Sequence, residues 1–240
     1  MTKIVAIGAG KGGVGKSTVS ANLAVALSFK GWKVGLLDGD IYGPSIPTMM
    51  KGEPLASEGS FPVYQAWGVH YTSLGSVMPS GKAAAWRGPM IQKALQHMLT
   101  DHWWKNCDIL VVDLPPGTGD ILISLCQSVD IAGAIVVATH HPVTLADLQR
   151  CINFFQILSV PLWGCIQNFS ALHCPQCHSV VDFASSRSLD AILHEHKVPL
   201  LGQLPWIHEM PAQPWIVENQ EDQFFQVISR VIESLKPHWL

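Results

Sequence analysis

A glycine-rich segment near the N-terminus carries the residue types that bind phosphate. Residues 10–18 read Gly-Lys-Gly-Gly-Val-Gly-Lys-Ser-Thr and satisfy the pattern G-x-x-x-x-G-K-[ST]. We expect the glycines to turn backbone N–H groups around an anion at the start of a helix. Lys16 would then reach the β- and γ-phosphates, and the Ser17 hydroxyl would ligate Mg²⁺; a glycine-rich turn without a ligand is the alternative. The predicted nucleotide-binding residues of this loop are Gly10, Lys11, Gly12, Gly13, Val14, Gly15, Lys16, Ser17 and Thr18.

Carboxylates follow two apolar runs that read as strands. Asp38 and Asp40 follow the first run, and Asp113 follows the second. Because parallel strands end at the ligand-binding edge of a sheet, we expect Asp38 and Asp113 to serve Mg²⁺ there. The alternative for the first two carboxylates is that they cap the next turn. Two prolines precede Gly117, which is predicted to permit close backbone approach to the γ-phosphate.

Cys174 and Cys177 form the one close cysteine pair in the sequence. Their C-x-x-C spacing lets both thiolates bind one metal centre, but zinc sites and iron–sulfur clusters usually need four ligands. A two-fold dimer would bring two such pairs together as Cys₄. The open interpretations are a bridging [4Fe–4S] cluster, a bridging structural zinc, a redox or structural thiol pair, and haem attachment through Cys174 and Cys177 with His178. The other four cysteines are predicted to lie in the core: Cys107, Cys126, Cys151 and Cys165.

The composition limits the function classes. Charged residues make up 14% of the 240, apolar residues make up 48%, and the net charge is −3. Such a chain has enough apolar residues for a large core and lacks the basic excess of most nucleic-acid-binding domains. No apolar run approaches the ~18 residues of a membrane helix, and the N-terminus lacks a secretion signal. We therefore expect a cytoplasmic protein with neither nucleic acid nor membrane as a partner.

Apolar strand-like runs alternate with helical periodicity along the chain, which predicts an α/β fold with a doubly wound, mostly parallel sheet flanked by helices. We expect one P-loop ATPase domain over residues 1–240, with a metal-binding segment inserted at 168–183. Residues 43–81 are predicted to hold at most one short strand, at 69–73, and to lie on the ligand side of the sheet. The expected strands are 3–8, 33–37, 109–112, 131–138, 162–166 and 200–204. The expected helices are 16–29, 89–100, 121–128, 145–158, 186–194 and 220–235, the last ended by Pro237.

These motifs together resemble the deviant Walker A ATPases with a SIMIBI-like fold and, within them, the Mrp/ApbC family. The resemblance rests on the second lysine, Lys11, on segments 38–47, 86–90 and 113–120, and on Asn168 followed shortly by Cys-Pro-x-Cys. It implies an ATP-binding homodimer that carries a labile [4Fe–4S] cluster between its subunits, from a scaffold to apo iron–sulfur proteins.

The same resemblance implies roles for individual residues. Lys11 would cross to the phosphates held by the other subunit, and Asp40 would orient the attacking water. Asn168 would read the adenine edge, and the loop after Leu204 and Pro205 would flank the base; a buried structural Asn is the alternative for Asn168.

The sequence departs from the family pattern at two positions. Gln167 precedes Asn168 where the family usually has Glu, and His178 stands where Gly commonly follows the second cysteine. Ligation by His173 or His178 therefore stays open, and Arg87 receives no role. Two other functions are alternatives: spatial positioning or partitioning of the MinD/ParA kind, and a zinc-stapled targeting ATPase.

Overall fold

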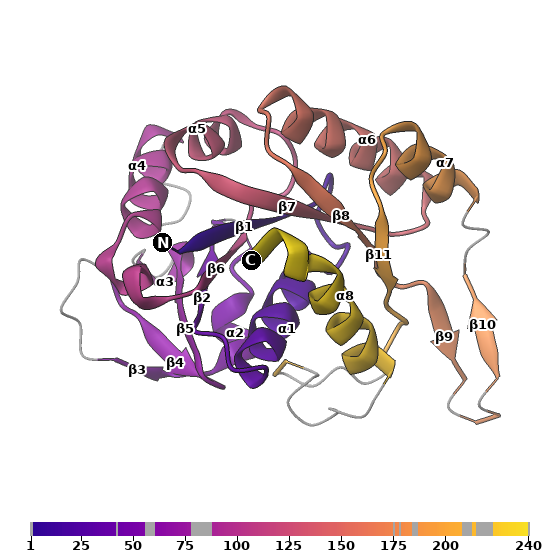
Figure 1. Ribbon diagram of the computed structural model, residues 1–240, viewed down its shortest axis with the longest axis horizontal. Helices are drawn as coiled ribbons and strands as arrows, with labels where there is room; N and C mark the ends of the chain where they lie inside the picture. Colours follow the sequence, from indigo (N-terminus) through magenta and orange to yellow (C-terminus); the bar gives the residue numbers. More distant parts are fainter. Residues whose placement is uncertain are drawn as a thin grey trace.

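The computed structural model describes residues 2–41, 43–55, 61–77, 88–174, 176–177, 179–183, 187–207, 213–214 and 223–239. Its centre is a nine-stranded sheet with the order β11-β8-β7-β1-β6-β2-β5-β4-β3 (Figure 1). The strands from β11 to β5 in this order are parallel, and β4 and β3 join antiparallel at the edge. The strands are β1 Lys3–Gly8, β2 Val34–Asp38, β3 Glu53–Pro54, β4 Tyr64–Ala66, β5 Val69–Ser73, β6 Ile109–Asp113, β7 Ile131–Ala138, β8 Leu162–Gln167 and β11 Leu200–Gln203.

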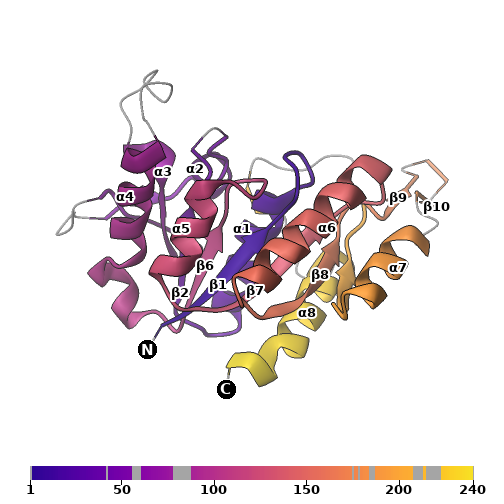
Figure 2. The same cartoon turned by 90° about the horizontal axis from the view of Figure 1, so that it is seen from above.

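Helices cover both faces of this sheet (Figures 1 and 2). One face packs on α1 and α8, and the other packs on α4, α5, α6 and α7, so two apolar cores lie on either side of the strands. The predicted doubly wound, mostly parallel sheet flanked by helices is confirmed. The helices are α1 Lys16–Phe29, α2 Ile46–Met50, α3 Leu74–Val77, α4 Gly88–Leu99, α5 Asp120–Ser128, α6 Pro142–Ile157, α7 Arg187–Glu195 and α8 Gln223–Trp239, with a 3₁₀ helix at His102–Asn106.

The central strands are apolar on both sides because both sides are covered. Every residue of β2 and β6 is buried. These two strands pair in parallel with Asp38 directly opposite Asp113, the last residue of each. The register therefore brings two carboxylates to one point of the sheet edge, beside the loop that follows β1.

The prediction for residues 43–81 is partly wrong. The strand at 69–73 is present, but β3 and β4 add two antiparallel strands and prolong the sheet beyond β2. Trp67 and Gly68 both have positive φ and form the tight turn between β4 and β5, and the rings of Tyr64 and Tyr71 stack 5.5 Å apart across it. Cross-strand aromatic packing therefore stabilises strands that are too short to show a recognisable alternating pattern in the sequence.

The last helix does not end where it was predicted to end. Pro237 lies inside α8, which continues to Trp239. A proline in the last turn removes only one backbone hydrogen bond, and the apolar stripe of the helix packs on the sheet regardless. No helix in the described ranges combines the length and apolar character needed to cross a bilayer.

A two-stranded antiparallel hairpin stands apart from the main sheet within the predicted metal-binding segment. It consists of β9 Ala171–His173 and β10 Val180–Asp182, and it lies at one end of the molecule's long axis in both views (Figures 1 and 2). Strands β3 and β4 lie at the opposite end. The hairpin leaves the sheet directly after β8, at the edge where the loop after β1 also lies.

Candidate nucleotide site and cysteine hairpin

The loop between β1 and α1 has an open concave backbone. Gly13 and Gly15 both have φ of +84°, a left-handed conformation that favours glycine. A side-chain atom added at Gly13 would meet nothing within 4 Å, so space lies in front of the loop. Helix α1 begins at Lys16 with Gly15 as its N-cap and no capping side chain. Its first N–H groups are thus not capped by a side chain and suit an anion.

Lys16 lies at the centre of a buried polar cluster. Its Nζ is 2.8 Å from Asp113 Oδ1, and both side chains are almost fully buried. Ser17 Oγ donates to Asp113 Oδ2 at 2.6 Å, and Ser20 Oγ donates to Asp113 Oδ1 at 2.7 Å. The described chain gives the buried ammonium this ion pair and no hydrogen-bond acceptor beside it. This is the donor that a phosphate oxygen would satisfy.

Asp38 lies near this polar cluster, and its carboxylate is hydrogen-bonded by other groups of the chain. Its carboxylate accepts hydrogen bonds from the backbone N–H groups of Asp40 and Ile46 and from the Ser73 hydroxyl, at 3.1, 3.2 and 3.2 Å. Burial, and after it the nearby charge of Asp113, raises the pKa of Asp38 to about 7. The turn-capping geometry is therefore present, and the Mg²⁺ role of Asp38 stays a prediction.

A cleft of about 460 Å³ is lined by most of the predicted phosphate-loop residues, but not by Gly10, Val14, Gly117 or Asn168. Asp40 and the exposed residue Lys11 line the same cleft. Gly117 anchors the neighbouring loop, since its N–H donates to Ala9 O at 3.1 Å. The residues lining the cleft are Lys11, Gly12, Gly13, Gly15, Lys16, Ser17, Thr18, Asp40, Gly43, Ser45, Met49 and Pro116.

Asn168 holds the phosphate loop from the end of β8. Its Nδ2 donates to Val14 O at 2.9 Å, its backbone N–H donates to Ala138 O, and the residue is buried. A side chain at Gly15 would overlap this amide. The observed contact is that of a structural Asn, and its predicted role toward adenine stays a prediction.

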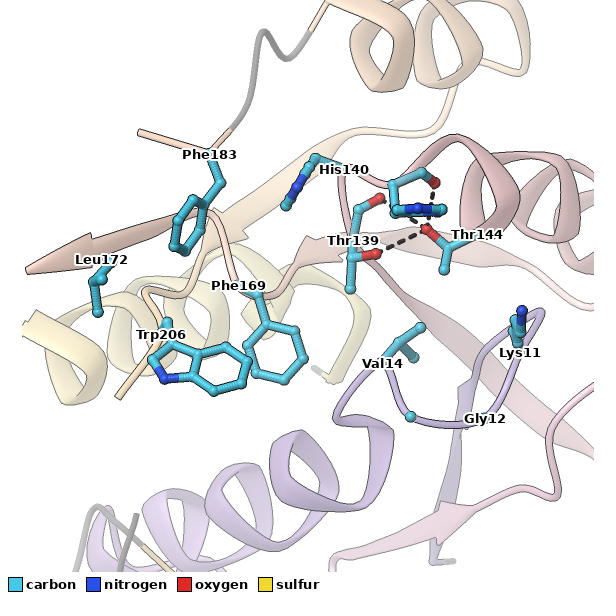
Figure 3. A pocket seen from close by; sticks show the side chains of 12 residues that line it. Lys11, Gly12, Val14, Thr139, His140, Thr144, Phe169, Leu172, Phe183 and Trp206 are labelled. Atoms are coloured by element: carbon cyan, nitrogen blue, oxygen red, sulfur yellow. Dashed lines mark hydrogen bonds between the residues drawn. The ribbon is translucent and has the colours of Figure 1, made fainter. Parts of the chain in front are cut away.

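A second cavity of about 560 Å³ shares Lys11, Gly12 and Gly13 with the first (Figure 3). The rings of Phe169 and Trp206 lie 4.7 Å apart at one wall, and those of His140 and Phe183 stack 5.9 Å apart at another. Nδ1 of His140 is buried without a hydrogen-bond partner in the described part of the chain. The residues lining the cavity are Lys11, Gly12, Gly13, Val14, Thr139, His140, His141, Thr144, Phe169, Leu172, Phe183 and Trp206.

The cysteine pair occupies the turn of the β9–β10 hairpin. Cys174 is half-buried and Cys177 is exposed. The Cys174 N–H donates to Ser179 O at 2.9 Å, and Cys177 Sγ lies 2.9 Å from Ser179 Oγ. Hydrogen bonds with Ser179, and after them one with Cys174, lower the pKa of Cys177 to about 7. Cys177 is thus presented to solvent with a thiol that loses its proton more readily than an ordinary cysteine, and Cys174 is only partly exposed beside it.

The described residues contain no group of three or more His, Cys, Asp and Glu side chains placed to hold a metal ion. Cys174 and Cys177 lie in one hairpin turn, and their predicted binding of a metal centre stays a prediction. Of the four other cysteines, Cys107, Cys151 and Cys165 are buried in the core as predicted, whereas Cys126 is partly buried at its margin. Burial raises the pKa of each of the four. Arg87, His178 and the side chain of His173 lie outside the described residues, so their roles stay open.

Comparison with known proteins decides the family. A model of the ParA group described as the NUBPL iron-transfer P-loop NTPase matches residues 1–235. The chain belongs to this family. It is 39% identical to an iron-sulfur cluster carrier protein of Aquifex aeolicus, across 96% of this chain and 68% of that one. Carriers of the same description from Escherichia coli K12 and Methanocaldococcus jannaschii are 41% and 38% identical; the chain spans 65% and 87% of their lengths.

Solved structures agree with this placement in the NUBPL-type family. A nucleotide-binding protein of Archaeoglobus fulgidus, in complex with ADP and with cobalt found, superposes with a TM-score of 0.71 at 26% identity. The match covers 99% of this chain and 90% of that one. The cell division ATPase MinD of Pyrococcus furiosus has a TM-score of 0.74 at 20% identity, with 99% of both chains covered, which shows a shared fold.

Sequence reasoning missed the side chains of Ser20 and Phe169. Ser20 binds Asp113, and its spacing of four residues after Lys16 on one helix was the available signal. Phe169 lines the second cavity, and no local pattern marks it because its contact with Trp206 joins chain positions far apart. Trp206 lies in the loop after Leu204 and Pro205 that was expected to flank the base, and that role stays a prediction. The structure brings Lys16, Ser17 and Asp113 into direct contact and places the cysteine pair on a separate element.

Proposed function

We propose that the protein is an ATP-dependent carrier of iron–sulfur clusters that works as a homodimer. The observation that carries the proposal is the short connection between the phosphate loop and the cysteine turn. The exposed C-x-x-C turn belongs to a hairpin that begins three residues after Asn168, and Asn168 binds the phosphate loop directly. The protein's family and the names of its relatives support the same function.

The residues of the loop fit a nucleotide with Mg²⁺. The buried ammonium of Lys16 has no hydrogen-bond acceptor in the described chain, and the concave glycine backbone and the helix start suit phosphate oxygens. Ser17 and Asp113 would hold Mg²⁺, which neutralises phosphate charge. Asp40 would position the water for hydrolysis, and Lys11 would serve the phosphates of the partner subunit, as the exposed position of Lys11 allows.

The cargo is bound by thiolates. Cys174 and Cys177 supply two, and a two-fold axis through the hairpin turns supplies four, the number that a [4Fe–4S] cluster takes. A cluster held by an exposed turn with few anchoring contacts suits delivery to an apoprotein better than one buried in a core. ATP binding and hydrolysis would be coupled to loading or release.

A transfer assay tests this function. Protein reconstituted without oxygen is mixed with an apo acceptor that takes a [4Fe–4S] cluster, with and without Mg·ATP, and acceptor absorbance is followed. We expect transfer by the wild type and a changed rate with Mg·ATP, and no nucleotide effect in Lys16→Ala. No transfer under any nucleotide condition would refute the carrier role.

Spatial positioning of the MinD/ParA kind is the second candidate, and the shared fold favours it. It gives no role to the exposed cysteine pair. Co-sedimentation with liposomes or DNA in the presence of Mg·ATP distinguishes the two, since the carrier should stay in the supernatant. Zinc in place of iron in protein purified without oxygen would support the zinc-stapled alternative.

A further inference from the structure

Three residues connect the phosphate loop to the cysteine hairpin. Asn168 donates its amide to Val14 O at 2.9 Å, and β9 begins at Ala171. Between them lies Phe169, whose φ is +55°. A left-handed backbone is uncommon for a bulky aromatic residue and persists only where surrounding contacts over-determine it.

The contacts that hold Phe169 come from both sites. Its ring lies against the phosphate loop, with Cζ 3.5 Å from the position a Cβ of Gly15 would take. On the other side the ring packs against the indole of Trp206, with centroids 4.7 Å apart (Figure 3). Phe169 therefore fills the space between the loop and Trp206.

Trp206 in turn anchors the hairpin. Its backbone N–H donates to Ala171 O at 2.6 Å, and it forms a parallel bridge with Leu172 in β9. The Ser170 N–H donates to Leu204 O at 2.9 Å, just before it. The hairpin is thus hydrogen-bonded to the segment from Leu204 to Trp206, and Phe169 packs against Trp206 of that segment.

The second strand of the hairpin is also held at this edge, at its base, where the Phe183 N–H donates to Ser170 O. The Phe183 ring, which follows β10, stacks on His140, which follows β7. The cavity between these aromatic pairs is bounded by the loop residues Gly12 and Val14 (Figure 3). Because packed side chains move as discrete arrangements, a shift of the loop must displace Phe169 or be resisted by it.

We propose that Phe169 is the positioning residue through which an occupied phosphate loop sets the position of the cysteine hairpin. This inference rests on the proposed function. An anion recruits the backbone N–H groups of the loop, and the loop presses on Phe169, Trp206 and β9 in that order. The coupling is reciprocal: if a bound nucleotide changes the affinity of the hairpin for a ligand by some factor, that ligand changes the affinity for nucleotide by the same factor.

The test measures alkylation of Cys177 in the apo, reduced full-length protein. Iodoacetamide labelling rates are determined by peptide mass spectrometry with and without Mg·ADP, at a protein concentration where light scattering shows one oligomeric state in both. The variants are Phe169→Ala and Phe169→Met, because Met fills irregular gaps and keeps a sulfur–aromatic contact with Trp206. Phe29→Ala is the matched control, since Phe29 is an exposed aromatic at the far end of α1.

We expect the nucleotide to change the Cys177 rate at least about fivefold in the wild type, in Phe29→Ala and in Phe169→Met. In Phe169→Ala the ratio should fall to about one while the Kd for Mg·ADP stays within about threefold. The inference alone is overturned if nucleotide changes the Cys177 alkylation rate of Phe169→Ala as much as that of the wild type. It is also overturned if the wild type binds nucleotide without any change in this rate. A wild type that binds no nucleotide overturns the proposed function as well.

Discussion

The phosphate loop and the cysteine turn differ in how completely one chain builds them. Buried residues from two other elements hold the loop: Asp113 at the end of β6, which contacts Lys16 and Ser17, and Asn168 after β8, which donates to Val14 O. The cysteine turn is exposed and joins two strands of three residues each. Such short strands are marginal alone. The residues that contact one another around the loop all come from one chain. Two cysteines are fewer ligands than zinc sites and iron–sulfur clusters usually take, so the proposed metal site would need a second copy of the turn.

Replacing Lys16 should have the largest effect of these variants, and that effect should be confined to nucleotide binding at the phosphate loop. Lys16→Ala deletes the phosphate donor and leaves Asp113 buried opposite no cation, so we expect Mg·ATP affinity to fall by about 1,000-fold, or about 4 kcal/mol. Isothermal titration measures it. Cys177 alkylation without nucleotide should be unchanged; a variant that binds Mg·ATP as the wild type does would contradict the assignment.

The raised pKa of Asp38 predicts a pH dependence of stability. The folded pKa of about 7 lies above the ordinary value of 3.8, so the folded state holds a proton that the unfolded state has lost. The free energy of unfolding should therefore decrease as pH rises from about 4 to about 7, by about 3–4 kcal/mol from this group.

Asp38→Asn provides the comparison, since it removes the titration. The difference between wild type and variant in urea unfolding, measured at several pH values, should change in favour of the variant as pH rises. A difference independent of pH would show that the Asp38 carboxyl is not buried as described.

Two glycines of the loop form a matched pair. Both have φ of +84°, but a side chain at Gly15 would overlap the Asn168 amide, whereas one at Gly13 meets open space. We expect Gly13→Ala to cost about 1 kcal/mol of unfolding free energy from backbone strain, and Gly15→Ala about 2 kcal/mol more from overpacking. Equal costs in thermal or urea unfolding would show that Asn168 does not brace the loop.

The smallest effect on stability is expected for substitutions in the cysteine turn. Replacing Cys174 and Cys177 together by Ala should change the free energy of unfolding by less than about 0.5 kcal/mol, because the thiols face solvent. Cys165→Ala, in the core, should cost about 1 kcal/mol or more. A large loss in the hairpin variant would mean that the turn is part of the folded core.

The same contrast explains what the sequence could predict. The loop is encoded locally by glycines and a lysine, and the meeting of Ser17 with Asp113, 96 positions apart, follows from the rule that parallel strands end at one edge. The cysteine pair lies in the predicted inserted segment, and its binding of metal stays a prediction. Strands β3 and β4 were missed because cross-strand packing, not local pattern, stabilises them, and the left-handed Phe169 is a product of tertiary contacts.

The central claim is that two chains share one cluster through their hairpin turns. The direct measurement is iron per chain after reconstitution without oxygen, combined with light scattering, for the wild type and for Cys174→Ala/Cys177→Ala, with Cys126→Ala as control. The account predicts about four irons for each pair of chains in the wild type and the control. It predicts no bound iron in the double variant, which still binds Mg·ATP. Equal iron in the double variant, or a full cluster on a single chain, would contradict it.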